Sequence, residues 1–280
     1  MAETAQEIAK KSKSSFYYAF NLLPAEKRDA MNTVYAFCRK TDDIIDEGSD
    51  PAEIKYEKLR KWRLEFERAF SGHSNYPLLN KLGKTISNFN IPLDPFFELI
   101  KGMEMDLQKD RYKSFDDLQL YCYRVASTVG LMCIEIFGYK NPSTRDFAIN
   151  LGIALQLTNI LRDIGKDAEN GRIYLPQDDL KKFSYSENEV FEKIFNENFK
   201  DMMTYEVGRA KHYFDTATSN LDLDDKKTMF AARAMQHIYF KMLEKIVAAD
   251  YDVYNNNIKV STFEKAGISL GVWAKYSLVY

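Results

Sequence analysis

The sequence predicts an all-α protein that forms a single bundle of helices. Glycine (12) and proline (7) are scarce among the 280 residues, so residues that break helices are few. Apolar residues recur at three- and four-residue spacing, and segments that alternate as strands do are almost absent. No low-complexity linker or short repeat divides the chain. We therefore expect residues 1–280 to form one domain.

Breakers and capping residues divide the chain into helices. Pro24 opens the first helix, and the run Gly-Ser-Asp-Pro at 48–51 ends it and starts the next. Ser114 has the side chain of an N-cap, with an acidic residue three positions later. The expected helices cover about 24–47, 51–70, 92–106, a segment from 115 onward, and 143–167, with two or three more after an irregular polar stretch at 166–176.

Composition narrows the possible partners. Lys and Arg (39) nearly balance Asp and Glu (41), which leaves no overall attraction to nucleic acid or anionic lipid. Cys38, Cys122 and Cys133 are too few and too scattered for a disulfide framework or a zinc site, so we expect buried thiols in a reducing cytoplasm. The N-terminus has no apolar signal core, and the weakly charged run at 125–139 is too short to span a bilayer. Contact with a membrane surface stays open.

A first polar cluster lies near the end of the helix that Pro24 opens. Tyr35, Arg39, Asp42 and Asp46 follow one another at spacings of four, three and four, which places them on one helix face. Two carboxylates one turn apart repel each other, and a bridging divalent cation would offset that cost. A solvated acidic face near a helix end is the alternative. Asp43 points off the shared face, and its role stays open.

A second polar cluster lies on the helix expected over 143–167. Gln156, Asn159, Asp163 and Asp167 again share one face of an otherwise apolar helix. A polar stripe on such a helix needs polar partners when it is buried. A hydrogen-bonded network with another core helix is the alternative, and it suits the anionic groups less well.

The two clusters together predict a site for magnesium and a diphosphate. Two Asp-x-x-x-Asp pairs about 120 residues apart can face each other across a bundle, and ligands that are all oxygen suit Mg²⁺. Arg39, Arg162 and Arg172 could bind phosphate oxygens. A carbocation left by the departing diphosphate needs a dry cavity with aromatic faces, and aromatic residues reach 14% of the chain. Candidates for such walls, each also suited to an ordinary core, are Phe16, Tyr17, Tyr18, Phe20, Tyr35 and Tyr121.

At these residues the chain resembles the squalene/phytoene synthase family of head-to-head prenyl transferases. Segments 35–46 and 156–176 look like the two aspartate motifs of that family, the second with its Gly-Arg-Ile-Tyr tail. Segments 14–20 and 121–130 are also similar, and the resemblance extends over roughly residues 10–250. It implies an isoprenoid-synthase helical bundle with a central apolar cavity.

The resemblance also implies roles for individual residues. Metal ligands, for about two or three Mg²⁺ ions held with the diphosphate, would be Asp42, Asp46, Asn159, Asp163 and Asp167. Catalytic residues would be Tyr121, Tyr174, Arg39 and Arg162. Substrate-binding residues would be Ser15, Phe16, Tyr35, Arg39, Ala126, Val129, Gln156, Asn159 and Arg172. Gly130 would join Ala126 and Val129 in making room for a prenyl chain, whereas Ser127 stands where many relatives have Gly.

Within the family, segments 102–107 and 121–127 resemble most closely the bacterial presqualene diphosphate synthases of hopanoid pathways. This implies Mg²⁺-dependent condensation of two farnesyl diphosphates to presqualene diphosphate, without NADPH and alongside partner enzymes of the pathway. An NADPH-dependent squalene synthase, a phytoene or dehydrosqualene synthase, and a non-catalytic scaffold relative remain alternatives. Chain-elongating and cyclising enzymes carry Asp-Asp-x-x-Asp, which residues 42–46 match, but the second motif does not fit them. The prenyl chain length and the oligomeric state stay open.

Overall fold

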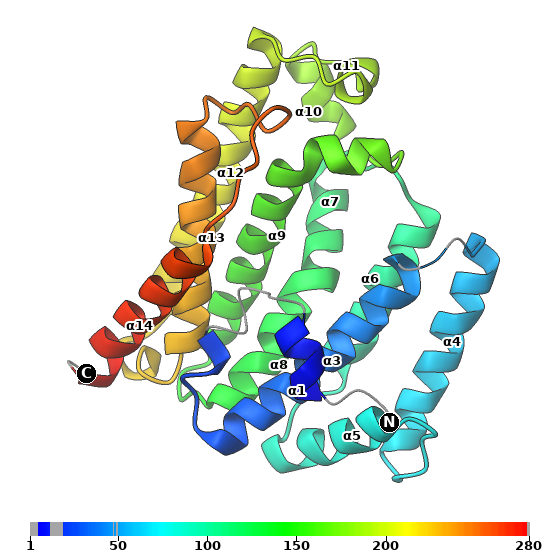
Figure 1. Cartoon of the computed structure of the whole chain (residues 1–280), viewed down its shortest axis with the longest axis vertical. Helices are drawn as coiled ribbons and strands as arrows, with labels where there is room; N and C mark the ends of the chain where they lie inside the picture. Colours follow the sequence, from blue (N-terminus) through cyan, green and yellow to red (C-terminus); the bar gives the residue numbers. More distant parts are fainter. Residues whose placement is uncertain (1–4, 12–18, 47, 49, 279–280) are drawn as a thin grey trace.

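The computed structural model describes residues 5–11, 19–46, 48 and 50–278 (Figure 1). Within this part of the chain the architecture is all-α, as predicted, and an isolated parallel bridge between Arg111 and Ile173 takes the place of any sheet. The first half contains α1 (Ala5–Lys11), α3 (Ala25–Asp46), α4 (Ala52–Ala69), α5 (Pro77–Phe89), α6 (Asp94–Gln108), α7 (Phe115–Cys122), η1 (Tyr123–Ser127) and α8 (Thr128–Phe137). The second half contains α9 (Ser143–Glu169), α10 (Gln177–Lys182), α11 (Glu187–Phe191), α12 (Glu197–Asn220), η2 (Leu223–Asp225), α13 (Phe230–Ala248) and α14 (Thr262–Leu278).

The predicted helices are confirmed to within about two residues at their ends. Ser114 caps α7, because its Oγ accepts a hydrogen bond from the Asp117 N–H at 3.4 Å. The sequence analysis expected two or three helices after residue 176, where the described residues contain five α-helices, and it missed two earlier helices, α1 and α5. The first turn of α5 holds Pro77, and this helix buries Leu79, Leu82 and Ile86, whose spacing of three and four is the ordinary signal of a helix.

Helix α9 lies in the centre of the bundle (Figure 1). It packs along α12 and α13 on one side and along η1 and α8 on the other, while α3 packs against α5, α6 and α8. Helices α4 and α5 lie beyond α3 at one edge, and α14 lies against α13 at the opposite edge (Figure 1). The two aspartate motifs therefore lie on neighbouring parts of one bundle.

Helices α7 and α8 form one long helix that the five-residue π-turn η1 interrupts. Two glycines allow this turn to pack closely. A Cβ on Gly102 would lie 2.8 Å from Val125 Cγ1, and a Cβ on Gly152 would lie 2.4 Å from the Cα of Ser127. Ser127 is buried and donates a hydrogen bond from Oγ to the Ile149 carbonyl at 2.7 Å.

Among the described helices, the stretch Phe115–Phe137 alone is long and apolar enough to cross a bilayer. More than half of its most apolar window is buried in the protein, against α6 and α9. The apolar run predicted at 125–139 thus lies mostly within a helix that is longer than expected, because that helix begins at Phe115, and its burial places it as a core helix of the bundle. Of the three free thiols, those of Cys122 and Cys133 are buried, as predicted, whereas Cys38 is half-buried.

The loop that follows α9 is tied to the connection between α6 and α7. The Ile173 N–H donates to the Asp110 carbonyl at 3.0 Å, and the Gln177 N–H donates to the Tyr112 carbonyl at 2.9 Å. Arg111 adds a bond from Nη1 to the Gly171 carbonyl at 2.8 Å. These contacts hold the tail of the second aspartate motif against α6 and α7.

Candidate active site

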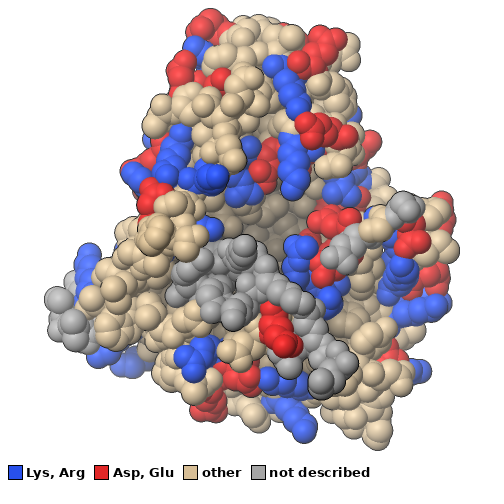
Figure 2. Space-filling view, viewed as in Figure 1, with Lys and Arg blue, Asp and Glu red and all other residues tan. Residues whose placement is uncertain are grey.

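Two adjoining hollows lie beside α9. One is polar and open, with side chains from α3, α6 and α9 in its wall, and we call it the polar chamber. The other is lined almost wholly by apolar side chains of α3, η1, α8, α9 and α13, and we call it the apolar cavity. Gln156 and Asn159 line both hollows. Figure 2 shows the surface hollowed near the middle of this face, with acidic and basic side chains along the rim.

Asp42 and Asp46 of the first motif line the polar chamber from the last turns of α3. Arg39 lies beside them and donates from Nη1 to Asp42 Oδ2 at 3.0 Å. Asp43 instead pairs with the Nε of Arg39 at 2.7 Å and with Lys40 at 3.5 Å, and it is not among the residues that line the chamber. The first motif therefore presents two carboxylates and one guanidinium to the chamber.

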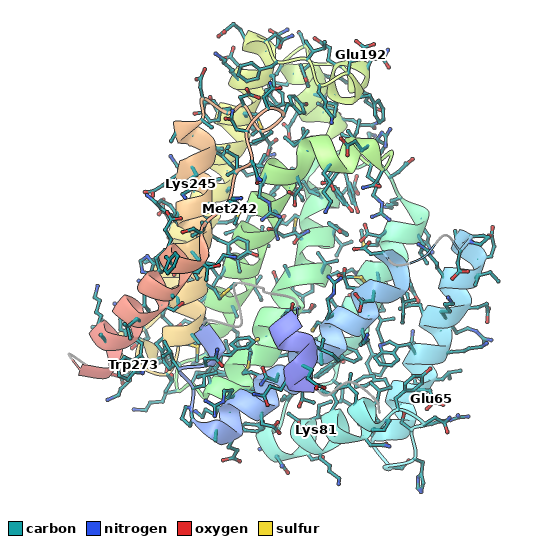
Figure 3. All side chains as sticks on the ribbon, viewed as in Figure 1. Glu65, Lys81, Glu192, Met242, Lys245 and Trp273 are labelled. Atoms are coloured by element: carbon teal, nitrogen blue, oxygen red, sulfur yellow. The ribbon has the colours of Figure 1, made fainter. Side chains whose placement is uncertain are left out.

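The second motif presents its whole predicted polar face to the same chamber. Gln156, Asn159, Asp163 and Asp167 all line it from α9. Arg162 pairs with Asp163 through two hydrogen bonds, one of them from Nε to Oδ1 at 2.8 Å. Arg162 also reaches Met242 Sδ on α13 at 3.2 Å, and Figure 3 labels Met242 on that helix. The structure thus brings the two Asp-x-x-x-Asp pairs together across one hollow.

Burial and neighbouring carboxylates disfavour the ionised form of two aspartates in this chamber. Burial, reinforced by Asp46, raises the pKa of Asp42 to about 7 in spite of Arg39. Burial, reinforced by Asp163, raises the pKa of Asp167 to about 7 in the same way. A divalent cation would stabilise the ionised form of these carboxylates, and ligands that are all oxygen suit Mg²⁺.

The donor set fits magnesium only with ligands from outside the protein. Among the described residues, no three histidine, cysteine, aspartate or glutamate side chains converge closely enough to hold a metal ion by themselves. Mg²⁺ binds through one or two carboxylates and completes its coordination with water and substrate phosphates. The separated carboxylate pairs match that mode of binding.

Five cationic side chains line the polar chamber. Arg39, Arg162 and Arg172 were predicted from the sequence, and Lys55 and Lys166 were not. Lys166 lies within the second motif, where its position beside Asp163 and Asp167 could have indicated it. Lys55 comes from α4 and donates a hydrogen bond to a carbonyl at the end of α3. Its place in the chamber depends on how α4 folds back on α3, which no local pattern shows.

Tyr121 and Tyr174 lie together in the chamber wall. Their rings are stacked with centroids 5.1 Å apart, and both hydroxyls donate to the carboxylate of Asp106 at 3.0 Å. Arg172 approaches the same residue, since its Nη2 donates to the Asp106 carbonyl at 3.2 Å. The sequence analysis did not select Asp106, although it is an acidic residue between apolar neighbours in segment 102–107.

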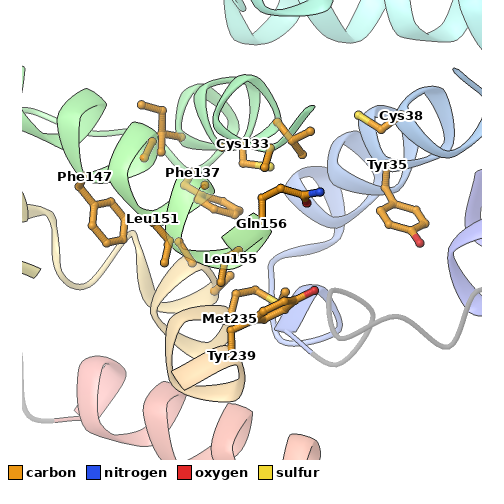
Figure 4. Close-up of a pocket in the computed structure, with 18 of the residues that line it drawn as sticks. Tyr35, Cys38, Cys133, Phe137, Phe147, Leu151, Leu155, Gln156, Met235 and Tyr239 are labelled. Carbon is orange, nitrogen blue, oxygen red and sulfur yellow. The ribbon is translucent and has the colours of Figure 1, made fainter. Parts of the chain in front are cut away.

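The apolar cavity encloses about 920 Å³ of empty volume, part of which is open to solvent. Figure 4 shows Tyr35 on α3, Gln156 on α9 and Tyr239 on α13 among its lining. The predicted wall residues Phe20, Tyr35, Ala126, Val129 and Gly130 also line it.

Some predicted residues lie elsewhere or have another role. A Cβ on Gly130 would meet the Ala148 carbonyl oxygen at 3.0 Å, so this glycine also serves the close packing of α8 on α9. Tyr121 lines the polar chamber rather than the apolar cavity. Ser15, Phe16, Tyr17 and Tyr18 fall outside the described residues.

Comparisons with known proteins agree with this geometry. A family model described as squalene/phytoene synthase matches residues 9–264. The phytoene synthase of Arthrospira platensis is 35% identical over 276 residues, which cover 94% of this chain and 89% of that protein. A crystal structure of a dehydrosqualene synthase with a ligand superimposes with a TM-score of 0.86 at 30% identity, covering 99% of this chain and 96% of the other. The squalene synthase HpnC from Alicyclobacillus acidocaldarius superimposes with a TM-score of 0.79 at 27% identity, covering 88% of this chain and 94% of the other.

Proposed function

The chain belongs to the squalene/phytoene synthase family, and on this premise we propose that it joins two prenyl diphosphates head to head. The C1–O bond of the donor breaks, and diphosphate leaves with the electron pair. The 2,3 double bond of the acceptor attacks the resulting allylic cation at C1. Loss of one proton closes a cyclopropane ring, so the products are a cyclopropylcarbinyl diphosphate, diphosphate and a proton.

The observation that carries this proposal is a polar chamber that joins an apolar cavity. Two carboxylate pairs and three arginines line the chamber, and Gln156 and Asn159 lie where it meets the cavity. A prenyl diphosphate has the same division, with an anionic head and a long apolar tail. The geometry therefore supports a substrate that places its head in the chamber and its tail in the cavity.

Asp42, Asp46, Asp163 and Asp167, with Asn159, would hold the magnesium ions of this reaction. Magnesium supplies charge neutralisation of the departing diphosphate. Arg39, Arg162 and Arg172 bind phosphate oxygens from the chamber wall, where bidentate contacts are favourable. The apolar cavity keeps water away from the allylic cation, and aromatic faces in the walls stabilise positive charge.

For the specific reaction, we propose two farnesyl diphosphates as substrates and presqualene diphosphate as the product, with no NADPH. The resemblance of segments 102–107 and 121–127 to bacterial presqualene diphosphate synthases supports this choice. The second candidate is a phytoene or dehydrosqualene synthase. It is favoured by curated phytoene synthases at 34–37% identity and by the dehydrosqualene synthase structure.

Product analysis separates these candidates. The purified protein is incubated with Mg²⁺ and either farnesyl or geranylgeranyl diphosphate, with and without NADPH, and the products are identified by mass. Presqualene diphosphate in both NADPH arms is expected. Squalene only with NADPH, or dehydrosqualene, would replace the specific proposal. Turnover of geranylgeranyl diphosphate alone would indicate a phytoene synthase, and no turnover of either substrate would indicate a scaffold relative.

Variants of the aspartate motifs test the site itself. Asp42→Ala and Asp163→Ala are expected to abolish diphosphate release while the far-ultraviolet circular dichroism stays that of a helical bundle. Asp110→Asn, an exposed change on the loop after α6, is the matched control and should keep wild-type activity. Undiminished release of diphosphate by either alanine variant would refute the assignment of the metal ligands.

We also propose that the protein works in the cytoplasm and delivers its product, a diphosphate with long apolar chains, to a partner enzyme at the membrane surface. The three free thiols suit a reducing compartment, and such a product dissolves poorly in water. Fractionation of cells with and without the pathway's later enzymes tests this, because the proposal expects membrane association only when those enzymes are present.

A further inference from the structure

The carboxylate of Asp106 joins two tyrosines from separate parts of the fold. Tyr121 Oη donates to Asp106 Oδ2 and Tyr174 Oη donates to Asp106 Oδ1, each at 3.0 Å. Asp106 lies on α6, Tyr121 lies on α7, and Tyr174 lies in the loop after α9. One carboxylate therefore fixes the two rings of the chamber wall relative to each other.

The hydrogen bonds also determine the electrostatic character of the two phenols. A phenol has a single hydrogen, and here each one is given to a separate carboxylate oxygen. The phenol oxygens, 3.4 Å apart, keep only lone pairs for other partners. A phenol that donates to an anion is polarised, so its oxygen and its ring gain electron density.

The position of Asp106 argues against its being a further metal ligand. Asp106 lines the polar chamber together with Asp46 and Asp167. Each of its carboxylate oxygens already accepts a hydrogen bond from a tyrosine hydroxyl, and the rings of those two tyrosines stack on each other. Burial raises its pKa to about 6, which still leaves it ionised at neutral pH. The negative charge thus acts on the substrate through the tyrosines.

We propose that Asp106 is a positioning residue that holds Tyr121 and Tyr174 as an electron-rich pair beside the allylic cation, so that the cation is captured by the second prenyl diphosphate rather than by water. This inference rests on the proposed head-to-head condensation. A cation beside an aromatic face is stabilised by electrostatic attraction to the ring. The pair lines the chamber where the diphosphate departs, and that chamber meets the apolar cavity at Gln156 and Asn159. The cation therefore forms within reach of these faces.

The test measures how ionised donor is partitioned between coupling and hydrolysis. Wild type, Asp106→Asn, the pair Tyr121→Phe with Tyr174→Phe, and the triple variant receive Mg²⁺ and the prenyl diphosphate that the wild type uses. Released diphosphate, coupled product and prenyl alcohol are quantified. Asp106→Asn is expected to lower the coupled fraction about tenfold, because the two rings lose the carboxylate that polarises them and fixes their position beside the cation. KM should stay within about twofold, because substrate binding is not the step affected.

Asp110→Asn is the matched control, since it removes an exposed carboxylate four residues away and should leave the product ratio unchanged. If Asp106 acts through the phenols, the triple variant should have the same coupled fraction as the variant with Tyr121→Phe and Tyr174→Phe, because Asp106→Asn then has no hydroxyl left to act on. An equal tenfold effect in that background would overturn the inference, as would an unchanged coupled fraction in Asp106→Asn. Should Asp106→Asn fail to fold, the double phenylalanine variant still has to show the tenfold loss of coupling. Absence of any wild-type turnover would instead refute the proposed function.

Discussion

Replacing Gly152 with alanine tests how closely η1 packs on α9. The new Cβ would lie 2.4 Å from the Cα of Ser127 and 2.5 Å from its nitrogen, whereas ordinary contacts of a Cβ begin near 3.4 Å. Both atoms are backbone, so no rotamer change relieves the clash, and the two segments must separate by about 1 Å. Overpacking of this kind costs about 1–3 kcal/mol, with a backbone clash at the upper end, and better helix propensity returns about 1 kcal/mol. We expect the free energy of unfolding to fall by about 2 kcal/mol.

Gly208 provides the control for this measurement. It lies within α12, and a Cβ there would meet nothing within 4 Å. Gly208→Ala should therefore raise the free energy of unfolding by up to about 1 kcal/mol through helix propensity alone. Both variants are compared with the wild type by urea denaturation at equilibrium, with the slope m checked for constancy so that a midpoint shift reports stability.

The two variants should move the urea midpoint in opposite directions. A Gly152→Ala midpoint equal to that of Gly208→Ala would refute the close contact between α9 and the π-turn. The same change should also impair catalysis, because η1 carries Val125 and Ala126 into the wall of the apolar cavity. A destabilised Gly152→Ala variant with wild-type turnover would show that the cavity tolerates displacement of that wall.

Three further predictions concern stability, pH and thiol chemistry. Asp225→Ala should lower the free energy of unfolding by about 3 kcal/mol, because four hydrogen-bond donors before and within the first turn of α9 lose their acceptor. Those hydrogen bonds lower the pKa of Asp225, although burial opposes the shift. The difference in unfolding free energy between wild type and variant, measured by urea titration, should therefore become smaller as pH falls below about 4. A difference that does not change with pH would contradict this prediction. The metal-free protein should lose thermal stability as pH rises from about 4 to about 7, because burial and neighbouring carboxylates raise the pKa of Asp42 and Asp167 and the folded state then holds more protons than the unfolded state. Mg²⁺ with a non-hydrolysable prenyl diphosphate analogue should reverse that loss in melting curves, and an analogue equally effective in EDTA would count against a metal-dependent site. Burial raises the pKa of the Cys133 thiol, so this cysteine should react with a disulfide reagent at about pH 8 only after denaturation. Rapid labelling of Cys133 in the native protein, located by mass spectrometry, would show that the apolar cavity is open to the reagent.

Sequence reasoning worked best where one helix carries a whole motif. Helical spacing alone predicts that Gln156, Asn159, Asp163 and Asp167 share a face, and the structure places all four in one chamber. That the same chamber also receives Asp42 and Asp46 depends on tertiary packing, which the spacing within each helix leaves open. We expected the two aspartate pairs to face each other only because both carry carboxylates, which a shared magnesium site would bind.

The residues that the sequence analysis missed depend on long-range contacts. Asp106 belongs to the site because Tyr121 and Tyr174 converge on it from elements 15 and 68 residues further along the chain. Lys55 reaches the chamber because α4 folds back on the end of α3. The pairing of Arg39 with Asp43 as well as Asp42 is a choice between rotamers that helical spacing permits equally.

A short parallel contact joins the loop after α9 to the connection between α6 and α7. This contact makes one side of the chamber wall more rigid than the rest. Through it, Arg172 and Tyr174 are fastened to the backbone next to Asp106 by bonds at Ile173 and Gln177. That side of the chamber therefore moves as one piece, and it cannot swing open without breaking several hydrogen bonds together. Under the proposed function, substrate and product would therefore enter and leave through displacements elsewhere in the wall, while Asp106, Arg172 and Tyr174 keep their spacing.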